Sequence, residues 1–358
     1  MTDRRPKTAP VPAPPIRPSA APVATLYDVA RLAGVSAMTV SRVINDNPSV
    51  NAPMRERVME AVATLKYEVN QAARAARSGM TRVGLLYSNP SAAFLSEFLI
   101  GAMGQCARHG VQLILEHCDG VRSQQVALDK LIAGGVHGIL VPPPLCDSPA
   151  FLKRMAALVT PIVAIASARP AAGISAVRID DYGAARTMME HLFAGGHRDI
   201  AFVKGNPRHT PAQLRYQAYL DAMGEAGIRV APRRVAEGLF TYRSGLAAAR
   251  ELLTGPKRPS AVFASNDDMG AAVIAVAHGL RMRVPQDLVV CGFDDTPIAT
   301  TVWPELTTIR QPIGDMARAA IDIVFEQIVR RRNDLPVSAR HSVLPYALVG
   351  RESTGAGG

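Results

Sequence analysis

The sequence predicts two kinds of structure in one chain: a small all-helical headpiece, followed by an α/β core of two doubly wound parallel-sheet subdomains. Two observations lead to this prediction. Residues 25–65 contain three short segments with apolar residues at helical spacing. From residue 81 onward, short apolar runs alternate with amphipathic segments, which is typical of parallel strands covered by helices on both faces. A chain of 358 residues is long enough to bury a core in each part.

The front of the chain is basic. Residues 1–24 are rich in proline and alanine, and we expect a disordered, extended arm there. The net charge is +10 and the pI is about 9.8. Residues 1–80 carry 11 Lys and Arg against 6 Asp and Glu, which is half of the excess in under a quarter of the chain. This charge indicates a polyanionic partner, although a basic tail that only aids solubility is the alternative.

Other classes of protein are disfavoured by what the sequence lacks. The cysteines show no CxxC and no metal-ligand spacing, which fits reduced thiols in the cytosol; they are Cys106, Cys118, Cys146 and Cys291. The N-terminus has no apolar signal-peptide region, and no run reaches the ~18 apolar residues of a membrane span. We therefore expect a cytoplasmic protein that binds no metal. GxSxG, Walker, GxGxxG and HExxH motifs are missing, so we expect neither an enzyme nor a cofactor.

Residues 25–45, TLYDVARLAGVSAMTVSRVIN, predict two short helices joined by a tight turn. Thr25 can cap the first helix, and Gly34 can end it with a positive φ. Ser36 can cap the second helix, and each helix has one apolar face. The outward face of the second helix carries Ala37, Met38, Ser41, Arg42 and Asn45. This is the helix-turn-helix pattern, whose second helix enters the major groove of DNA.

A third helix should close the headpiece, which we place at residues 25–68. Asn51 can cap this helix, and Val58, Ala61, Val62 and Leu65 share one face. Residues 69–80 then form a linker rich in alanine and arginine, too short and polar to be a stable helix alone. Folding on binding and a plain linker both remain open for this segment.

The motifs DVARLAGVS and TVSRVIN closely resemble the DNA-reading motif of the LacI/GalR family of bacterial transcription regulators, and the resemblance continues along almost the whole chain. It implies that the linker is a hinge helix, which folds when a dimer sits on DNA and enters the minor groove. The family usually has a leucine wedge where this chain has Ala76, and a methyl group is a poor wedge. Either the operator is bent less, or Arg74 and Arg77 stabilise the bend along a narrow minor groove.

We expect hydroxyl-bearing residues to hold phosphates, and Ala37, Met38 and Arg42 to face base edges. Arg42 is the best candidate for a direct contact with guanine, whereas alanine and methionine can make only apolar contacts. The complete set of expected DNA-binding residues is Thr25, Tyr27, Ser36, Ala37, Met38, Thr39, Ser41, Arg42, Asn45, Asn70, Ala73, Arg74, Ala76 and Arg77.

In the core, eight short apolar runs predict strands, at residues 83–87, 111–115, 138–141, 161–166, 176–179, 200–203, 261–264 and 288–293. This number suits two doubly wound subdomains better than one barrel. The resemblance implies a core like that of periplasmic sugar-binding proteins, in which the last helix (313–330) returns to the first subdomain. The expected boundaries are 81–178 with 312–335 for the N-subdomain, 179–311 with 338–350 for the C-subdomain, and 351–358 for a flexible tail.

Ligands bind at the carboxyl ends of strands in doubly wound sheets, and polar residues follow several of the predicted strands. Arg215 lies on the helix after the sixth strand, and Phe240 and Trp303 offer flat apolar faces to a sugar ring. The resemblance assigns ligand contacts to Arg215, Asn266, Asp267, Asp294 and Phe240, whereas Ala166 replaces a polar residue that the family often has. The complete set of expected effector-binding residues is Tyr87, Ser88, Asn89, Asp119, Arg215, Phe240, Asn266, Asp267, Asp294 and Trp303.

The sequence therefore predicts a dimeric, ligand-controlled repressor that binds a near-palindromic operator and is released by a small sugar. The YSNPSAAFLSEF segment resembles the same region in regulators of β-glucoside or plant-oligosaccharide use. Three alternatives remain: a repressor that needs a purine-type corepressor, a sugar-binding transport protein, and an enzyme acting on a sugar phosphate. Because no leucine heptads follow the core, a dimer is favoured over a coiled-coil tetramer. The identity of the effector and of the operator stays open.

Overall fold

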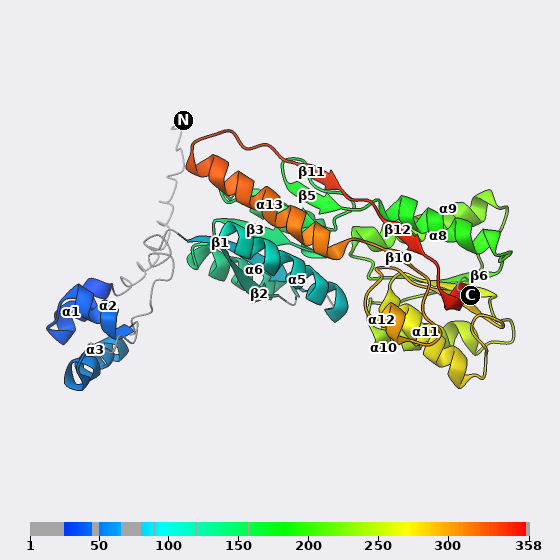
Figure 1. The fold of residues 1–358 in the computed structure, drawn as a ribbon, viewed down its shortest axis with the longest axis horizontal. Helices are drawn as coiled ribbons and strands as arrows, with labels where there is room; N and C mark the ends of the chain where they lie inside the picture. The colour runs from blue at the N-terminus through cyan, green and yellow to red at the C-terminus, as the bar shows by residue number, and fades with distance from the viewer. Residues whose placement is uncertain are drawn as a thin grey trace, which may run out of the picture. The chain divides into compact units, whose positions relative to one another are not determined.

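The computed structural model describes residues 25–44, 50–65, 80–88, 91–118, 120–156 and 158–355, and the chain divides into two compact units at residue 70 (Figure 1). The first unit is a three-helix headpiece and the second is an α/β core. Each is described by itself.

The headpiece begins with the predicted pair of short helices, α1 (Leu26–Ala33) and α2 (Ala37–Ile44). Thr25 caps α1 in a capping box, in which its hydroxyl accepts the backbone N–H of Asp28. Gly34 ends α1 at φ 64°, a left-handed conformation that favours glycine because a Cβ atom there would be strained. The turn between the helices therefore has the form that the sequence predicted.

The third helix, α3 (Ala52–Thr64), closes the small core of the headpiece. Asn51 caps it by accepting the backbone N–H of Met54 at 3.1 Å. The Arg57 side chain donates to the carbonyl of Ala33 at 2.5 Å and so satisfies a carbonyl at the end of α1. The buried core consists of Val29, Ala30, Ala33, Val40, Val43, Val58 and Ala61. A core this small leaves the domain marginally stable, so a cap or a single valine contributes a large share of its stability.

The first part of the α/β core is a six-stranded parallel sheet in the order β11-β5-β4-β3-β1-β2. Its strands are β1 (Thr81–Tyr87), β2 (Val111–His117), β3 (Gly138–Val141), β4 (Ile162–Ile165), β5 (Ser175–Arg178) and β11 (His341–Val343). The central strands β3 and β4 are buried along their whole length, as expected for strands with helices on both faces. The helices of this subdomain are α5 (Ala92–His109), α6 (Gly120–Ala133), α7 (Pro149–Ala156) and α13 (Ile313–Arg332).

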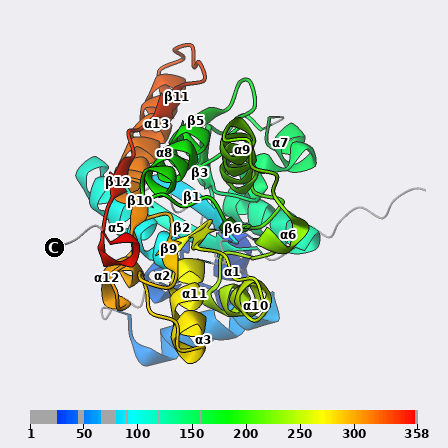
Figure 2. The same cartoon turned by 90° about the vertical axis from the view of Figure 1, so that its right-hand side faces the viewer.

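The second part is a four-stranded parallel sheet in the order β7-β6-β8-β9. Its strands are β6 (Ile200–Val203), β7 (Val235–Ala236), β8 (Ala261–Ala264) and β9 (Val289–Cys291). The helices are α8 (Asp181–Ala194), α9 (Thr210–Glu225), α10 (Tyr242–Leu253), α11 (Asp267–Gly279) and the short α12 (Ile298–Thr301). In Figure 2, α10 and α11 lie side by side, and they pack against each other. Two doubly wound parallel sheets confirm the predicted fold class.

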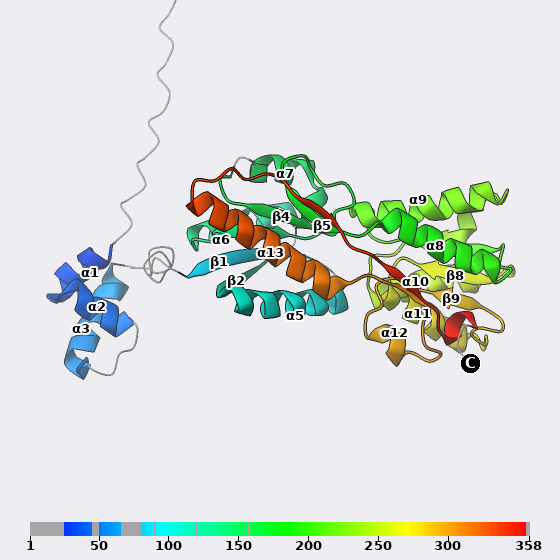
Figure 3. The same ribbon diagram turned by 45° about the horizontal axis from the view of Figure 1, so that its top comes forward.

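The chain crosses between the subdomains after β5, after β10 (Thr308–Arg310) and after β11. The last long helix, α13, packs against α5 and against strands of the first sheet (Figure 3). The strand β12 (Ala347–Val349) pairs antiparallel with β10 on the side of the second subdomain. These three connections bring the carboxyl ends of both sheets to the same junction.

The structure differs from the sequence prediction at the C-terminal end. We assigned residues 338–350 to the C-subdomain, but β11 pairs with β5 in the first sheet. We also expected 351–358 to be a flexible tail, whereas Ser353 is fully buried and its hydroxyl donates to the carbonyl of Val290 at 2.6 Å. Residues 351–358 are polar and glycine-rich, so they contain no apolar pattern that would predict packing. Hydrogen bonds rather than apolar contacts hold this segment. Strands β7, β10, β11 and β12, each of two or three residues, were not predicted.

All four cysteines are free and buried. Burial raises the pKa of the Cys106 thiol to about 11. Within the described ranges, no helix is both long and apolar enough to cross a bilayer.

Candidate functional site

The headpiece presents the outer face of α2 to solvent. Met38 is 65% exposed, Arg42 is exposed, and Ala37 and Ser41 are half-buried between them. These residues share one face because they fall one turn apart on a helix whose opposite face buries Val40 and Val43. Tyr27, on α1, is 72% exposed. This surface offers one guanidinium, one flexible apolar side chain and one tyrosine to a partner.

The hydroxyl groups expected to hold phosphates are partly engaged within the headpiece. Ser36 accepts the backbone N–H of Thr39 at 3.1 Å, and the two hydroxyl oxygens lie 2.9 Å apart. The hydroxyl of Thr25 donates to Asp28 at 2.6 Å, and hydrogen bonds from Thr25 lower the pKa of Asp28. These bonds fix the N-termini of α1 and α2, whose free N–H groups are suited to a phosphate.

Eight of the residues predicted to form the sites lie outside the described part of the chain: Asn45, Asn70, Ala73, Arg74, Ala76, Arg77, Asn89 and Asp119.

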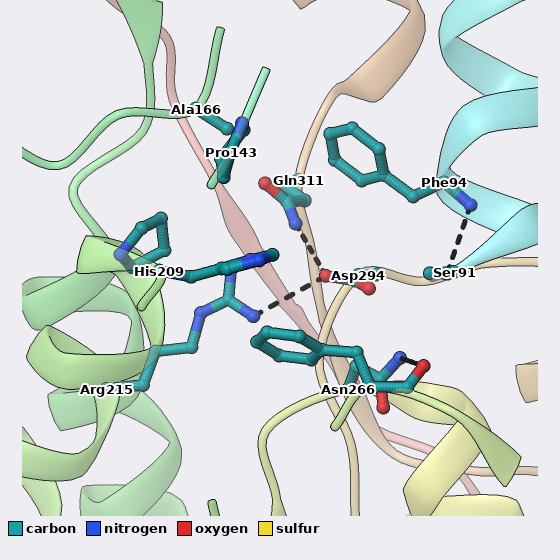
Figure 4. A pocket seen from close by; sticks show the side chains of 11 residues that line it. Ser91, Phe94, Pro143, Ala166, His209, Arg215, Asn266, Asp294 and Gln311 are labelled. Carbon is teal, nitrogen blue, oxygen red and sulfur yellow. Dashed lines mark hydrogen bonds and ion pairs between the residues drawn. The ribbon is translucent and has the colours of Figure 1, made fainter. Parts of the chain in front are cut away.

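The core contains a cavity at the junction of its two subdomains, with about 410 Å³ of unfilled space, part of it open to solvent (Figure 4). It is lined by Ser91, Phe94, Pro143, Ala166, His209, Pro211, Arg215, Phe240, Asn266, Asp294 and Gln311. Four of the predicted effector residues are therefore brought together here: Arg215, Phe240, Asn266 and Asp294.

Arg215 comes from the second turn of α9 and is 5% exposed. Its Nε donates to Asp181 at 2.9 Å and its Nη1 donates to the carbonyl of Ser265 at 2.7 Å. The guanidinium also lies 3.5 Å from the centre of the Phe293 ring. These contacts orient its remaining N–H groups toward Asp294, whose carboxylate is 3.7 Å away (Figure 4).

Asp294 follows β9 at φ 115°, a strained conformation for a residue with a side chain. Gln311, which follows β10, donates to its carboxylate at 2.5 Å. Burial raises the pKa of Asp294 to about 7, with a smaller rise from Asp268 and Asp181 that Arg215 and Gln311 oppose. A buried carboxylate in a cleft whose pKa is raised toward neutral pH is a candidate functional group.

Two aromatic side chains form apolar walls of the cavity. Phe94 comes from the first turn of α5 in the N-subdomain, and Phe240 precedes α10 in the C-subdomain. Phe240 has φ 62°, and its carbonyl accepts the Asn266 amide at 3.1 Å. Gly205 makes room for the ring, because a Cβ atom at that position would lie 2.1 Å from it. The site therefore combines two rings with polar groups that can each reach a hydroxyl.

Sequence reasoning missed His209, Ser91, Phe94 and Gln311. His209 is 4% exposed, and its Nε2 is buried without a hydrogen-bond partner. Burial, reinforced by the positive charges of Arg215 and Arg208, lowers the pKa of His209 to about 4. Ser91 and His209 are helix N-cap residues, so the helix starts in the sequence could have indicated them. Gln311 follows β10, a strand too short to be recognised from the sequence.

Four other predicted effector residues do not line the cavity. Asp267 is fully buried, and its carboxylate is engaged within the protein. It accepts the hydroxyl of Thr308 at 2.6 Å and the N–H of Thr296 at 2.8 Å. Trp303 is 75% exposed and lies beside His278. Tyr87 packs on the ring of His117, and the Ser88 hydroxyl is buried without a partner. These four residues do not line this cavity, and a contact between them and a ligand stays a prediction.

Across the described ranges, no group of three or more His, Cys, Asp or Glu side chains is arranged to hold a metal ion.

A helix-turn-helix unit joined to a two-subdomain core with a polar cavity defines a DNA-binding regulator with a small-molecule site. Residues 25–70 match the family model described as bacterial regulatory proteins, lacI family, and residues 189–354 match the periplasmic binding protein-like domain. The ribose operon repressor of Escherichia coli (strain K12) is 33% identical over 316 residues, which cover 86% of this chain and 94% of that protein.

Two solved structures are similar over 92% of this chain and 99% of the other. One is a complex of the transcriptional regulator CelR with cellobiose, at 30% identity and a TM-score of 0.70. The other is the lac repressor dimer bound to operator and the anti-inducer ONPF, at 28% identity and a TM-score of 0.69. The chain belongs to the LacI family of bacterial regulatory proteins, and it is a DNA-binding transcription regulator with an effector-binding core. Its relatives are regulators rather than enzymes.

Proposed function

We propose that the protein is a repressor of carbohydrate-use genes, which a small sugar bound in the core cavity releases from its operator. The observation that carries this proposal is the cavity itself. Arg215, Asp294, Asn266 and Gln311 bring donors and acceptors together between the rings of Phe94 and Phe240. Hydroxyl groups pair with such side chains, and the apolar face of a sugar ring suits an aromatic wall.

The DNA-binding side of the proposal rests on α2. Arg42 reaches a guanine in the major groove, and Met38 and Ala37 contact apolar base edges such as a thymine methyl. Thr25, Tyr27, Ser36, Thr39 and Ser41 hold phosphates and so set the register. Residues 69–79 lie outside the described part of the chain, and for them we propose a hinge helix that folds on DNA. Either the operator is bent less because Ala76 is a poor wedge, or Arg74 and Arg77 stabilise the bend.

We further propose that two copies act together, each headpiece on one half of a near-palindromic operator, and that the protein works in the cytoplasm, where the chromosome is. The similarity to a lac repressor dimer on its operator supports the dimer. The sugar acts by binding one relative arrangement of the two subdomains more tightly than the other, since equal affinity for both would shift nothing. The complex of CelR with cellobiose supports a sugar as the class of effector.

A purine-type corepressor is the second candidate, because Phe94 and Phe240 come from opposite subdomains and could also enclose a flat base. The two candidates change the affinity for DNA in opposite directions: a sugar inducer lowers it, whereas a corepressor raises it.

The test has two steps. Binding sites for the full-length protein are first selected from a random DNA library, and we expect a near-palindrome with two half-sites. Mono- and disaccharides, hypoxanthine and guanine are then titrated into the protein–DNA complex and followed by fluorescence anisotropy. Release by a sugar supports the proposal, and tighter binding with a purine supports the second candidate. A selected site without two-fold symmetry would contradict the dimer.

A further inference from the structure

The positive charge of the cavity is neutralised from within the protein. Among the cavity-lining residues that the structure describes, Arg215 is the one permanently cationic side chain. Its Nη2 lies 2.8 Å from the carboxylate of Asp181, and its Nη1 lies 3.7 Å from that of Asp294. Both carboxylates are buried with it, so solvent screens these interactions little. Arg215 therefore offers hydrogen bonds to a ligand without a net positive charge.

Three helix N-termini also converge on the cavity, at Ser91 of α5, His209 of α9 and Asn266 of α11. Helix N-termini attract anions through their free N–H groups and the helix dipole. Without compensation, the cavity would be suited to a phosphate or a carboxylate.

Each of these helix N-termini already faces a carboxylate of the protein. Asp147 accepts the backbone N–H of Thr210, the first residue of α9, at 2.8 Å. Asp268 accepts the Ser91 hydroxyl at the start of α5 at 3.2 Å, and it lies in the first turn of α11 together with Asp267. A carboxylate thus already takes a backbone N–H at the start of α9, and a carboxylate lies close to the starts of α5 and α11.

A further polar side chain of the cavity, that of His209, is neutral. The imidazole of His209 extends toward the middle of the cavity beside Arg215 (Figure 4). Its buried Nε2 has no partner in the protein, so it is left for the ligand to satisfy. Because burial keeps the pKa of His209 near 4, this nitrogen offers a hydrogen bond but no charge at pH 7.

We propose that the cavity selects an uncharged, hydroxyl-bearing effector and rejects its phosphorylated or carboxylated counterparts. The carboxylate of Asp294, which lines the cavity beside Arg215, acts against a second negative charge where burial strengthens the repulsion, and Asp181 and Asp147 add to it. This inference rests on the proposed function, since it specifies the ligand of the same cavity.

The first arm of the test uses inorganic phosphate as the probe. Melting of the full-length protein is followed at pH 7.5 in phosphate and in sodium chloride of equal ionic strength, for the wild type and for Asp294→Asn. We expect no phosphate-specific rise in Tm for the wild type and a rise of a few degrees for the variant, whose cavity has lost one carboxylate. Asp287→Asn, at an exposed carboxylate on the surface, is the matched control.

Every outcome of this arm is decisive. A phosphate-specific rise in the wild type overturns the proposal, because the cavity would then accept an anion. No rise in either protein overturns it as well, since Asp294 would not be what excludes anions.

The second arm compares ribose with ribose 5-phosphate, glucose with glucose 6-phosphate, and cellobiose with its 6-phosphate, by calorimetry. We expect any sugar that binds to lose at least about tenfold in affinity on phosphorylation, and a phosphorylated sugar that binds more tightly than its parent overturns the proposal. The phosphate arm decides the matter even when none of these sugars binds. A protein that binds an uncharged sugar without releasing DNA would refute the proposed function and still support this inference.

Discussion

At the scale of single residues, specificity for DNA depends on very few polar side chains. The two leading positions of α2 are Ala37 and Met38, which can make only apolar contacts with bases. Arg42 is the exposed side chain on this helix that can donate two hydrogen bonds to one guanine. The headpiece therefore reads sequence largely through one residue, together with half-site spacing and DNA shape.

We predict that Arg42→Ala weakens binding to the selected operator by about 1–3 kcal/mol and relaxes the preference at one base position of each half-site. Anisotropy on the operator and on single-base variants measures both effects. Arg283→Ala, which removes a cation 72% exposed on the core, is the matched control for charge. An equal loss of affinity on every DNA sequence would argue for a phosphate contact instead.

The chemistry of the effector cavity also depends on single residues, above all on Asp294. Its pKa is raised in the folded state, so the folded protein holds this proton more tightly than the unfolded chain does. The pKa of Asp294 is 3.8 in the unfolded chain and about 7 in the folded protein, so the free energy of unfolding falls as the pH rises between these two values. Above pH 7 the full destabilisation by the ionised carboxylate is present.

We predict that Asp294→Asn raises the free energy of unfolding of the effector-free core by on the order of 2 kcal/mol at pH 8, and that the gain shrinks toward zero as the pH approaches 4. Thermal melts of both proteins across this range measure it. Asp315→Asn, at an exposed pair with Arg318, is the control. A variant that melts below the wild type at pH 8 would show that the ionised carboxylate stabilises the fold.

At the scale of elements, the start of α9 is the point where the two subdomains hold each other on the His209 side of the cavity. Asp147 of the N-subdomain accepts the N–H and the hydroxyl of Thr210, at 2.8 and 2.9 Å. The Thr210 hydroxyl in turn accepts the N–H of Ala168 at 2.9 Å. Because Thr210 follows His209 directly, these contacts couple the position of a cavity residue to the relative arrangement of the subdomains.

We predict that Asp147→Ala lets the subdomains separate, since the Thr210 N–H then lacks a buried acceptor, at a cost of about 1–3 kcal/mol. Small-angle scattering of the full-length protein should show a larger radius of gyration for the variant, and limited proteolysis should cut the core faster. Asp129→Ala removes an exposed carboxylate of the N-subdomain and serves as the control. Unchanged scattering and proteolysis would mean that the other connections between the subdomains hold them together without Asp147.

At the scale of the whole core, the chain that follows α13 ties the subdomains together. It pairs with the first sheet through β11 and with β10 through β12. It then anchors Arg351, which donates to Asp295 and to the carbonyl of Leu306, at 2.6 and 2.8 Å. This segment therefore joins the edge strand of the N-subdomain sheet to the C-subdomain and contributes to the stability of both.

We predict that Arg351→Ala lowers the free energy of unfolding by about 2–3 kcal/mol, somewhat below the ~3–5 kcal/mol of a broken buried pair, because Asp295 keeps its contact with Arg310. Denaturant titration of the core measures the change. Arg340→Ala, which breaks an exposed pair with Glu326, should cost under about 1 kcal/mol. Equal losses in the two variants would show that the buried position of Arg351 is unimportant.

The sequence by itself determined the helix-turn-helix, the fold class of the core and the family. Caps, the glycine turn and 3.6-residue periodicity are local properties, so Thr25, Gly34 and Asn51 could be recognised without a structure. Arg215, Phe240, Asn266 and Asp294 could be picked out because they match motifs of the family that follow apolar runs or lie on a helix.

The tertiary structure decided which residues meet. His209 joins the cavity because Asp147 and Ala168 hold the start of α9, and Gln311 joins because β10 ends beside Asp294. Trp303 and Asp267 carry the right chemistry, but packing exposes Trp303 to solvent and buries Asp267 completely. The balance of carboxylates around Arg215 is likewise invisible in the sequence, since Asp181 and Asp294 come from two distant segments. Only the fold, by burying them around one guanidinium, decides that the cavity carries no net positive charge.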